Sequence, residues 1–141
     1  MKAGLIGIVA VSIVLTIPFT ALAETQDRVP IADLEAALHD LDSDYGDVPS
    51  AVNCDSQADA GTAVALICSD PYLRTAELLN TRAAAYMYEN GTKSEVDHKA
   101  WRGEIPTECK TGDCIYGAFR EQTDDALGGE SPYYKFYSTH K

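Results

Sequence analysis

The sequence lacks most of the residue patterns that catalytic and metal sites require. Its three histidines, His39, His98 and His140, are scattered, and no two cysteines have the CxxC spacing. Zinc sites use closely spaced ligand pairs, so this scatter argues against zinc. The chain also has no glycine-rich phosphate loop and no dinucleotide fingerprint. These absences disfavour an enzyme, and we expect no catalytic residues, no metal and no cofactor.

Positive charge is also scarce. The chain has 11 lysines and arginines against 22 aspartates and glutamates, which gives a net charge of −11. Such an acidic surface disfavours binding to nucleic acid or to an anionic membrane, and it favours a basic partner. The acidity could instead serve only to keep the protein in solution, and charge alone does not separate these two explanations.

A single long apolar run is present, and it lies at the start of the chain. It extends from Leu5 to about Leu15 and is followed by Ala21-Leu22-Ala23, a small-x-small pattern. This order is typical of a secretory signal peptide, and the run is short for a bilayer-spanning helix of about 20 residues. We predict that residues 1–23 form a signal peptide, cleaved after Ala23, and that the protein is periplasmic or secreted without a membrane anchor.

The predicted mature chain has 118 residues and a net charge of −12, because the signal peptide carries one lysine and no acid. This length suits one small domain. Its four cysteines are Cys54, Cys68, Cys109 and Cys114, an even set that in an exported chain indicates disulfides. We favour Cys54–Cys68 and Cys109–Cys114, since both pairs close short loops, but a crossed pairing remains open.

Helix signals recur along the mature chain. Apolar residues at helical spacing predict a first helix from Ile31 that ends near Gly46. Thr62 can cap a short helix, and Asp70-Pro71 starts the longest one, with Leu73 on its core face.

The second half of the chain continues this pattern. A helix capped by Ser94 carries Trp101, which we expect in the core, and a last helix follows Cys114. The fold class is therefore all-α, a small disulfide-stapled bundle of about four to five short helices. The aromatic tail, residues 128–141, could form a strand, a docked arm or a mobile end.

These motifs resemble the LprI-type lysozyme-inhibitor family of small exported bacterial domains. The resemblance rests on Cys54, the element Ile67-Cys68-Ser69-Asp70-Pro71-Tyr72-Leu73, Trp101, Cys109 and Cys114-Ile115. It covers about residues 53–127 and leaves residues 24–52 as an N-terminal extension with one amphipathic helix. Two departures are Ala76-Glu77, where the family often has Leu-Asp, and Gln122, where an arginine is common.

The resemblance implies a binding protein that inhibits lysozyme-like cell-wall hydrolases. An acidic domain would be steered to a basic hydrolase by its charge, which mainly raises the association rate. The corner with Lys110, Thr111 and Gly112 is a candidate plug, because the lysozyme cleft carries carboxylates that a non-acidic element would suit. The same corner could instead be a plain turn between two helices.

A second hypothesis is a non-inhibitory module of the bacterial envelope. In it, the acidic surface or the aromatic tail binds another envelope protein or a cell-wall glycan. Tyrosines of the tail would stack on sugars if they were exposed, although tail aromatics also pack onto their own domain.

Overall fold

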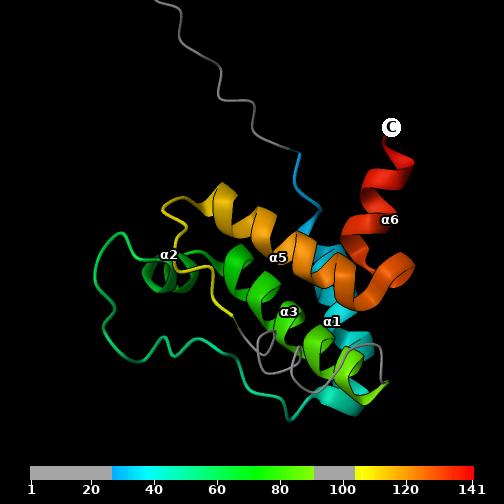
Figure 1. Ribbon diagram of the computed structural model, residues 1–141, viewed down its shortest axis with the longest axis horizontal. Coiled ribbons are helices and arrows are strands. Elements are labelled where there is room, and N and C mark those ends of the chain that lie inside the picture. Colours follow the sequence, from blue (N-terminus) through cyan, green and yellow to red (C-terminus); the bar gives the residue numbers. More distant parts are fainter. Residues whose placement is uncertain (1–26, 91–103) are drawn as a thin grey trace, which may run out of the picture.

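The computed structural model describes residues 27–90 and 104–141, and every regular element in these ranges is a helix (Figure 1). The all-α prediction is confirmed for these residues. The predicted signal peptide, residues 1–23, and most of the helix predicted after Ser94, including His98 and Trp101, lie outside them. The elements are α1 (Ile31–Tyr45), α2 (Ala63–Ser69), α3 (Pro71–Glu89), α5 (Gly112–Leu127), the 3₁₀ turn η1 (Gly128–Glu130) and α6 (Pro132–Thr139).

The helix starts follow the capping signals of the sequence. The Asp70 side chain accepts a 2.9 Å hydrogen bond from the Tyr72 amide, and Pro71 occupies the first turn of α3, where no amide hydrogen is needed. Thr62 caps α2 and Thr111 caps α5 in the same way, through amides three residues ahead. These caps fix where the long helices α3 and α5 begin, and therefore where their N-terminal ends meet.

The core lies between α3 and α5, which run side by side, and α1 and α2 also contact α3 (Figure 1). Leu73 of α3 is 1% exposed, and Ile115 and Phe119 of α5 are equally buried. Leu34 of α1 and Ile67 of α2 complete the same cluster. The N-terminal extension thus shares one core with the segment that resembles the LprI-type family.

Both disulfides connect the cysteines that the short-loop argument favoured. Cys54 pairs with Cys68 and Cys109 with Cys114, with Cα–Cα distances of 5.4 Å and 5.5 Å. The first ties the long loop after α1 to the end of α2, and the second ties the approach to α5 to its first turn. The crossed pairing does not occur.

The aromatic tail forms a docked helix, α6. Ser131 caps it by accepting from the Tyr133 amide, and Pro132 stands at its first position. Tyr133 is fully buried, whereas Tyr134 is 56% exposed. The helix leaves the bundle at its C-terminal end (Figure 1). No described helix is long and apolar enough to cross a membrane.

Candidate functional site

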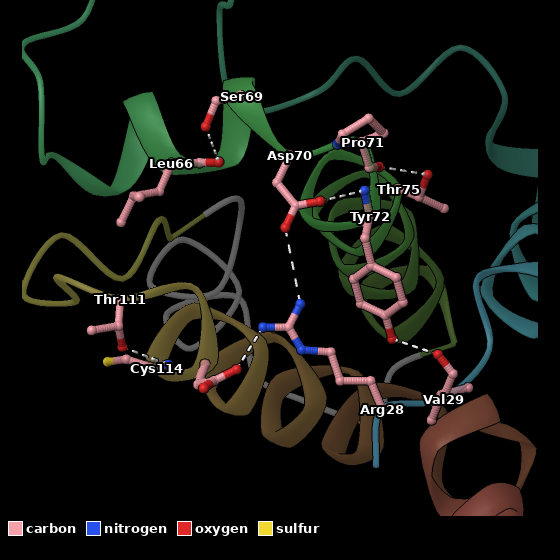
Figure 2. A network of polar contacts seen from close by, with 11 residues as sticks. Arg28, Val29, Leu66, Ser69, Asp70, Pro71, Tyr72, Thr75, Thr111 and Cys114 are labelled. Carbon is pink, nitrogen blue, oxygen red and sulfur yellow. Dashed lines mark hydrogen bonds and ion pairs between the residues drawn. The ribbon is translucent and has the colours of Figure 1, made fainter. Parts of the chain in front are cut away.

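The N-terminal ends of α3 and α5 are joined by one arginine from the segment before α1, residues 27–30, which we call the leader of α1. The Arg28 guanidinium donates a 2.6 Å hydrogen bond to Asp113 in the first turn of α5 and lies 3.9 Å from Asp70, the cap of α3 (Figure 2). It also lies over the rings of Tyr72 and Tyr116, 5.4 Å and 5.2 Å from their centroids. Two carboxylates and two aromatic faces thus enclose a single cation.

Tyrosine hydroxyls hold the backbone on both sides of this arginine. Tyr72 donates a 2.8 Å hydrogen bond to the Val29 carbonyl, and the Val29 amide donates to the Tyr116 hydroxyl at 3.1 Å. Tyr137 of α6 donates to the Asp27 carbonyl at 2.7 Å and lies 2.8 Å from the Tyr116 hydroxyl. The leader is therefore fixed to α3, α5 and α6 at once.

Burial changes the acidity of these tyrosines. It raises the pKa of Tyr72 and of Tyr137 to about 12, because a tyrosinate there would lose its hydration. Burial raises the pKa of Tyr116 and Tyr133 as well. All four phenols are protonated at neutral pH. Tyr72 and Tyr137 donate hydrogen bonds to backbone carbonyls, and Tyr116 accepts one from the Val29 amide. The buried Tyr133 hydroxyl has no hydrogen-bond partner among the described residues, so Tyr133 acts as a packing group.

The stapled corner, residues 109–114, projects from the same end of the bundle. Cys109 is buried, whereas Lys110 and Thr111 are exposed, and Lys110 is in no ion pair with another described residue. Gly112 is half-buried, and a Cβ there would lie 3.5 Å from Arg28 and 3.6 Å from Leu73. The three predicted plug residues thus lie on one short turn, and the Arg28 side chain lies next to Gly112 of that turn.

Two residues that depart from the family pattern have structural roles. Glu77 is 3% exposed, and its carboxylate accepts hydrogen bonds from Ser50, the Ala51 amide and Thr81 at 2.5–2.8 Å. Gln122 of α5 accepts a 2.8 Å hydrogen bond from Asn80 of α3. Glu77 therefore anchors the loop before Cys54, a role that sequence analysis missed.

Acids outnumber cations at the surface of the described residues, and most of the few cations there are already paired with acids. Arg28, Arg82, Arg120 and Lys135 each form an ion pair with a carboxylate of this chain. Helix α1 has no lysine or arginine, and its exposed acids are Asp33, Glu35, Asp40, Asp42 and Asp44. The net negative charge is thus carried at the surface, along one helix in particular.

The histidines and cysteines of the described residues are accounted for individually. His39 and His140 are both exposed, and His140 is stacked on Phe136. No group of three His, Cys, Asp or Glu side chains within residues 27–90 and 104–141 is arranged to hold a metal ion. All four cysteines are in disulfides, so none is available as a thiolate nucleophile.

Comparisons of this chain with known protein families, with curated proteins and with solved structures give no match. The resemblance to the LprI-type family accordingly stays a prediction from the motifs of the sequence. What the structure itself offers is a helical domain with an acidic surface and one disulfide-restrained corner, in which Lys110 is exposed and Asp113 is paired with Arg28.

Proposed function

We propose that this protein is an exported binding protein that docks on a basic partner, and that the partner is a lysozyme-like cell-wall hydrolase. The observation that carries the proposal is the charge asymmetry of the surface. Acids outnumber bases 22 to 11, and four of the basic side chains already pair with acids of the same chain. A basic protein would therefore be attracted over most of the surface.

The stapled corner supports an inhibitory mode of docking. Lys110 is exposed on this corner and forms no ion pair with another described residue, while Asp113 of the same corner is already paired with Arg28. The disulfide, the Thr111 cap and the Arg28–Asp113 pair all restrain its backbone before binding. Restraint before binding lowers the entropy cost of association, so a rigid corner suits entry into a narrow cleft lined by carboxylates.

The proposal is tested by titrating a basic lysozyme with the oxidised mature protein. We expect dose-dependent inhibition that is stronger at low salt than at physiological salt, since salt screens surface charges. Circular dichroism of the same sample establishes that it is folded. A folded protein that leaves the hydrolase fully active at both salt concentrations would contradict the proposal.

The acidic surface also suits the alternative, a non-inhibitory envelope module. Most of the tail tyrosines that would stack on sugars are, however, buried or hydrogen-bonded within the domain. Tyr133 is buried and Tyr137 is held by Asp27, so Tyr134 is the one well-exposed tyrosine of α6. A protein partner therefore suits this alternative better than a glycan. Binding to a basic envelope protein without loss of that protein's activity would favour it.

A further inference from the structure

An open groove lies between α1 and α6, away from the stapled corner. Its volume is about 570 Å³, which is within the range of sites that hold small ligands or a few side chains of a partner. Its floor is apolar and is formed by Ala36, Ala37, Leu41, Leu127 and Phe136. The two alanines leave room for a partner to approach the backbone of α1 closely.

The α1 wall of the groove is acidic. Asp33 and Asp40 line it, and neither carboxylate is in an ion pair with another described residue. They lie two turns apart on α1, which corresponds to about 10 Å along the helix axis. Ala36 and Ala37 lie between them, so this face of α1 presents acid, apolar surface and acid in succession.

The α6 wall does not cancel this charge. Lys135 lines the groove, but its ammonium is 2.7 Å from the Glu130 carboxylate, which lines the groove as well. His140 lies at the end of this wall, where its Nδ1 atom is 2.7 Å from the Phe136 carbonyl. The groove as a whole is thus apolar at its floor and negative along one side.

We propose that this groove is the docking site for a basic amphipathic helix of the partner. A helix with cations at positions i and i+7 would place them about 10 Å apart, which matches Asp33 and Asp40. Apolar residues at i+3 and i+4 would then face Ala36, Ala37 and Leu41, in the manner of helix-in-groove recognition. A second copy of this chain fits poorly, because its own net charge is −11. The inference rests on the proposed function only for the basic character of the partner.

A synthetic peptide tests the groove directly. The probe is a helical peptide of about 18 residues, long enough to form a helix, with Lys at i and i+7 and Leu at i+3 and i+4. Its matched control has Glu in place of both Lys. We expect the Lys peptide to bind the mature protein in fluorescence anisotropy and the Glu peptide not to bind. Equal binding of the two peptides would overturn the charge match.

Variants of the protein locate the binding. The double variant Asp33→Asn/Asp40→Asn should lower the affinity for the Lys peptide about five- to tenfold. The control Glu35→Gln/Asp44→Asn removes the same charge from α1 outside the groove and should change affinity less than about twofold. Ala36→Trp fills the groove and should abolish binding while circular dichroism stays unchanged. Equal effects of both double variants would mean that bulk charge alone binds the peptide, and would refute the site.

Two further outcomes would also decide the matter. If sedimentation shows a dimer that Ala36→Trp dissociates, the groove is occupied by a second copy and the helix proposal is wrong. Repeating the lysozyme titration with these variants separates the two proposals. Equal inhibition by all variants would support the proposed function and rule out the groove as the docking site. Peptide binding without any effect on lysozyme would support the groove as a docking site and rule out the hydrolase as the partner.

Discussion

Arg28 and Asp113 lie 85 residues apart in sequence and are joined by a 2.6 Å hydrogen bond that fixes the leader of α1 to the first turn of α5. Asp70 at the start of α3 lies 3.9 Å from the same guanidinium. One side chain thus balances the negative charges at two helix N-terminal ends, and the α5 end is part of the stapled corner (Figure 2).

Replacing Arg28 should destabilise the fold moderately. Arg28→Ala removes two partly exposed ion pairs and two cation–π contacts, and we expect it to lower the free energy of unfolding by about 1–2 kcal/mol. Arg28→Lys keeps the charge without the planar fork and should recover less than half of the loss. Urea denaturation measures both. The control Arg74→Ala, an exposed cation, should change stability by less than about 0.5 kcal/mol, and an equal loss there would contradict this role of Arg28.

Among the acidic residues, Glu77 should be the one whose neutralisation lowers the free energy of unfolding most. Its carboxylate accepts three hydrogen bonds while buried, and a glutamine offers only one acceptor oxygen. Glu77→Gln should therefore lower the free energy of unfolding by about 1–3 kcal/mol. Glu35→Gln, an exposed acid, should have almost no effect in the same urea experiment. Equal stability of the two variants would show that the loop before Cys54 does not depend on Glu77.

The tyrosine cluster predicts a loss of stability at alkaline pH. The folded pKa of Tyr72 and of Tyr137 is about 12, above the unfolded value of 10.0. The unfolded chain therefore loses these protons first, so the contribution is complete below about pH 10 and disappears as the pH rises to about 12. Absorbance titration of tyrosinate should show a late group among the eight tyrosines. A single transition near pH 10 in the folded protein would contradict the cluster.

The two disulfides should differ in their contribution to stability. Cys54–Cys68 closes the longer loop, with a separation of 14 residues against 5 for Cys109–Cys114. From loop entropy we expect about 3 kcal/mol and about 2 kcal/mol, respectively. The comparison uses Cys109→Ala/Cys114→Ala and Cys54→Ala/Cys68→Ala, each measured oxidised and reduced, so that only the remaining disulfide changes. A larger loss on reduction of the shorter loop would reverse the expected order.

Lys110 should matter for inhibition but little for stability. Lys110→Glu puts an acid at the tip of the stapled corner, where the proposed cleft is also acidic. We expect inhibition to weaken about tenfold, which corresponds to about 1.4 kcal/mol. The control Lys141→Glu makes the same change of charge at the chain terminus and should leave inhibition no weaker. Unchanged inhibition by Lys110→Glu would eliminate the plug.

The sequence predicted the features that depend on local chemistry. Asp70-Pro71 marked the start of α3, and short-loop closure favoured the disulfides that the structure contains. The tail sequence is compatible with a strand, a docked arm or a mobile end, although Ser131-Pro132 carries the same start signal as Asp70-Pro71 and marks the start of α6. The aromatic composition of the tail is also typical of a strand, so composition alone does not identify the helix.

Features that depend on distant contacts could not be predicted in this way. Arg28 lies in a polar leader with no local pattern, and its partners come from two other helices. Glu77 resembles any acid on a helix until the loop around Ser50 and Ala51 folds over it. The groove likewise depends on the angle between α1 and α6, which the pattern of neither helix specifies.

If the acidic surface guides this protein to a basic lysozyme-like hydrolase, as we propose, the association kinetics of the two proteins must depend on salt. The association rate constant of the mature protein with a basic lysozyme should fall by about tenfold or more from low to physiological salt, while the dissociation rate changes little. Absence of association at low salt, or an association rate that does not depend on salt, would show that the acidic surface does not guide this protein to the hydrolase.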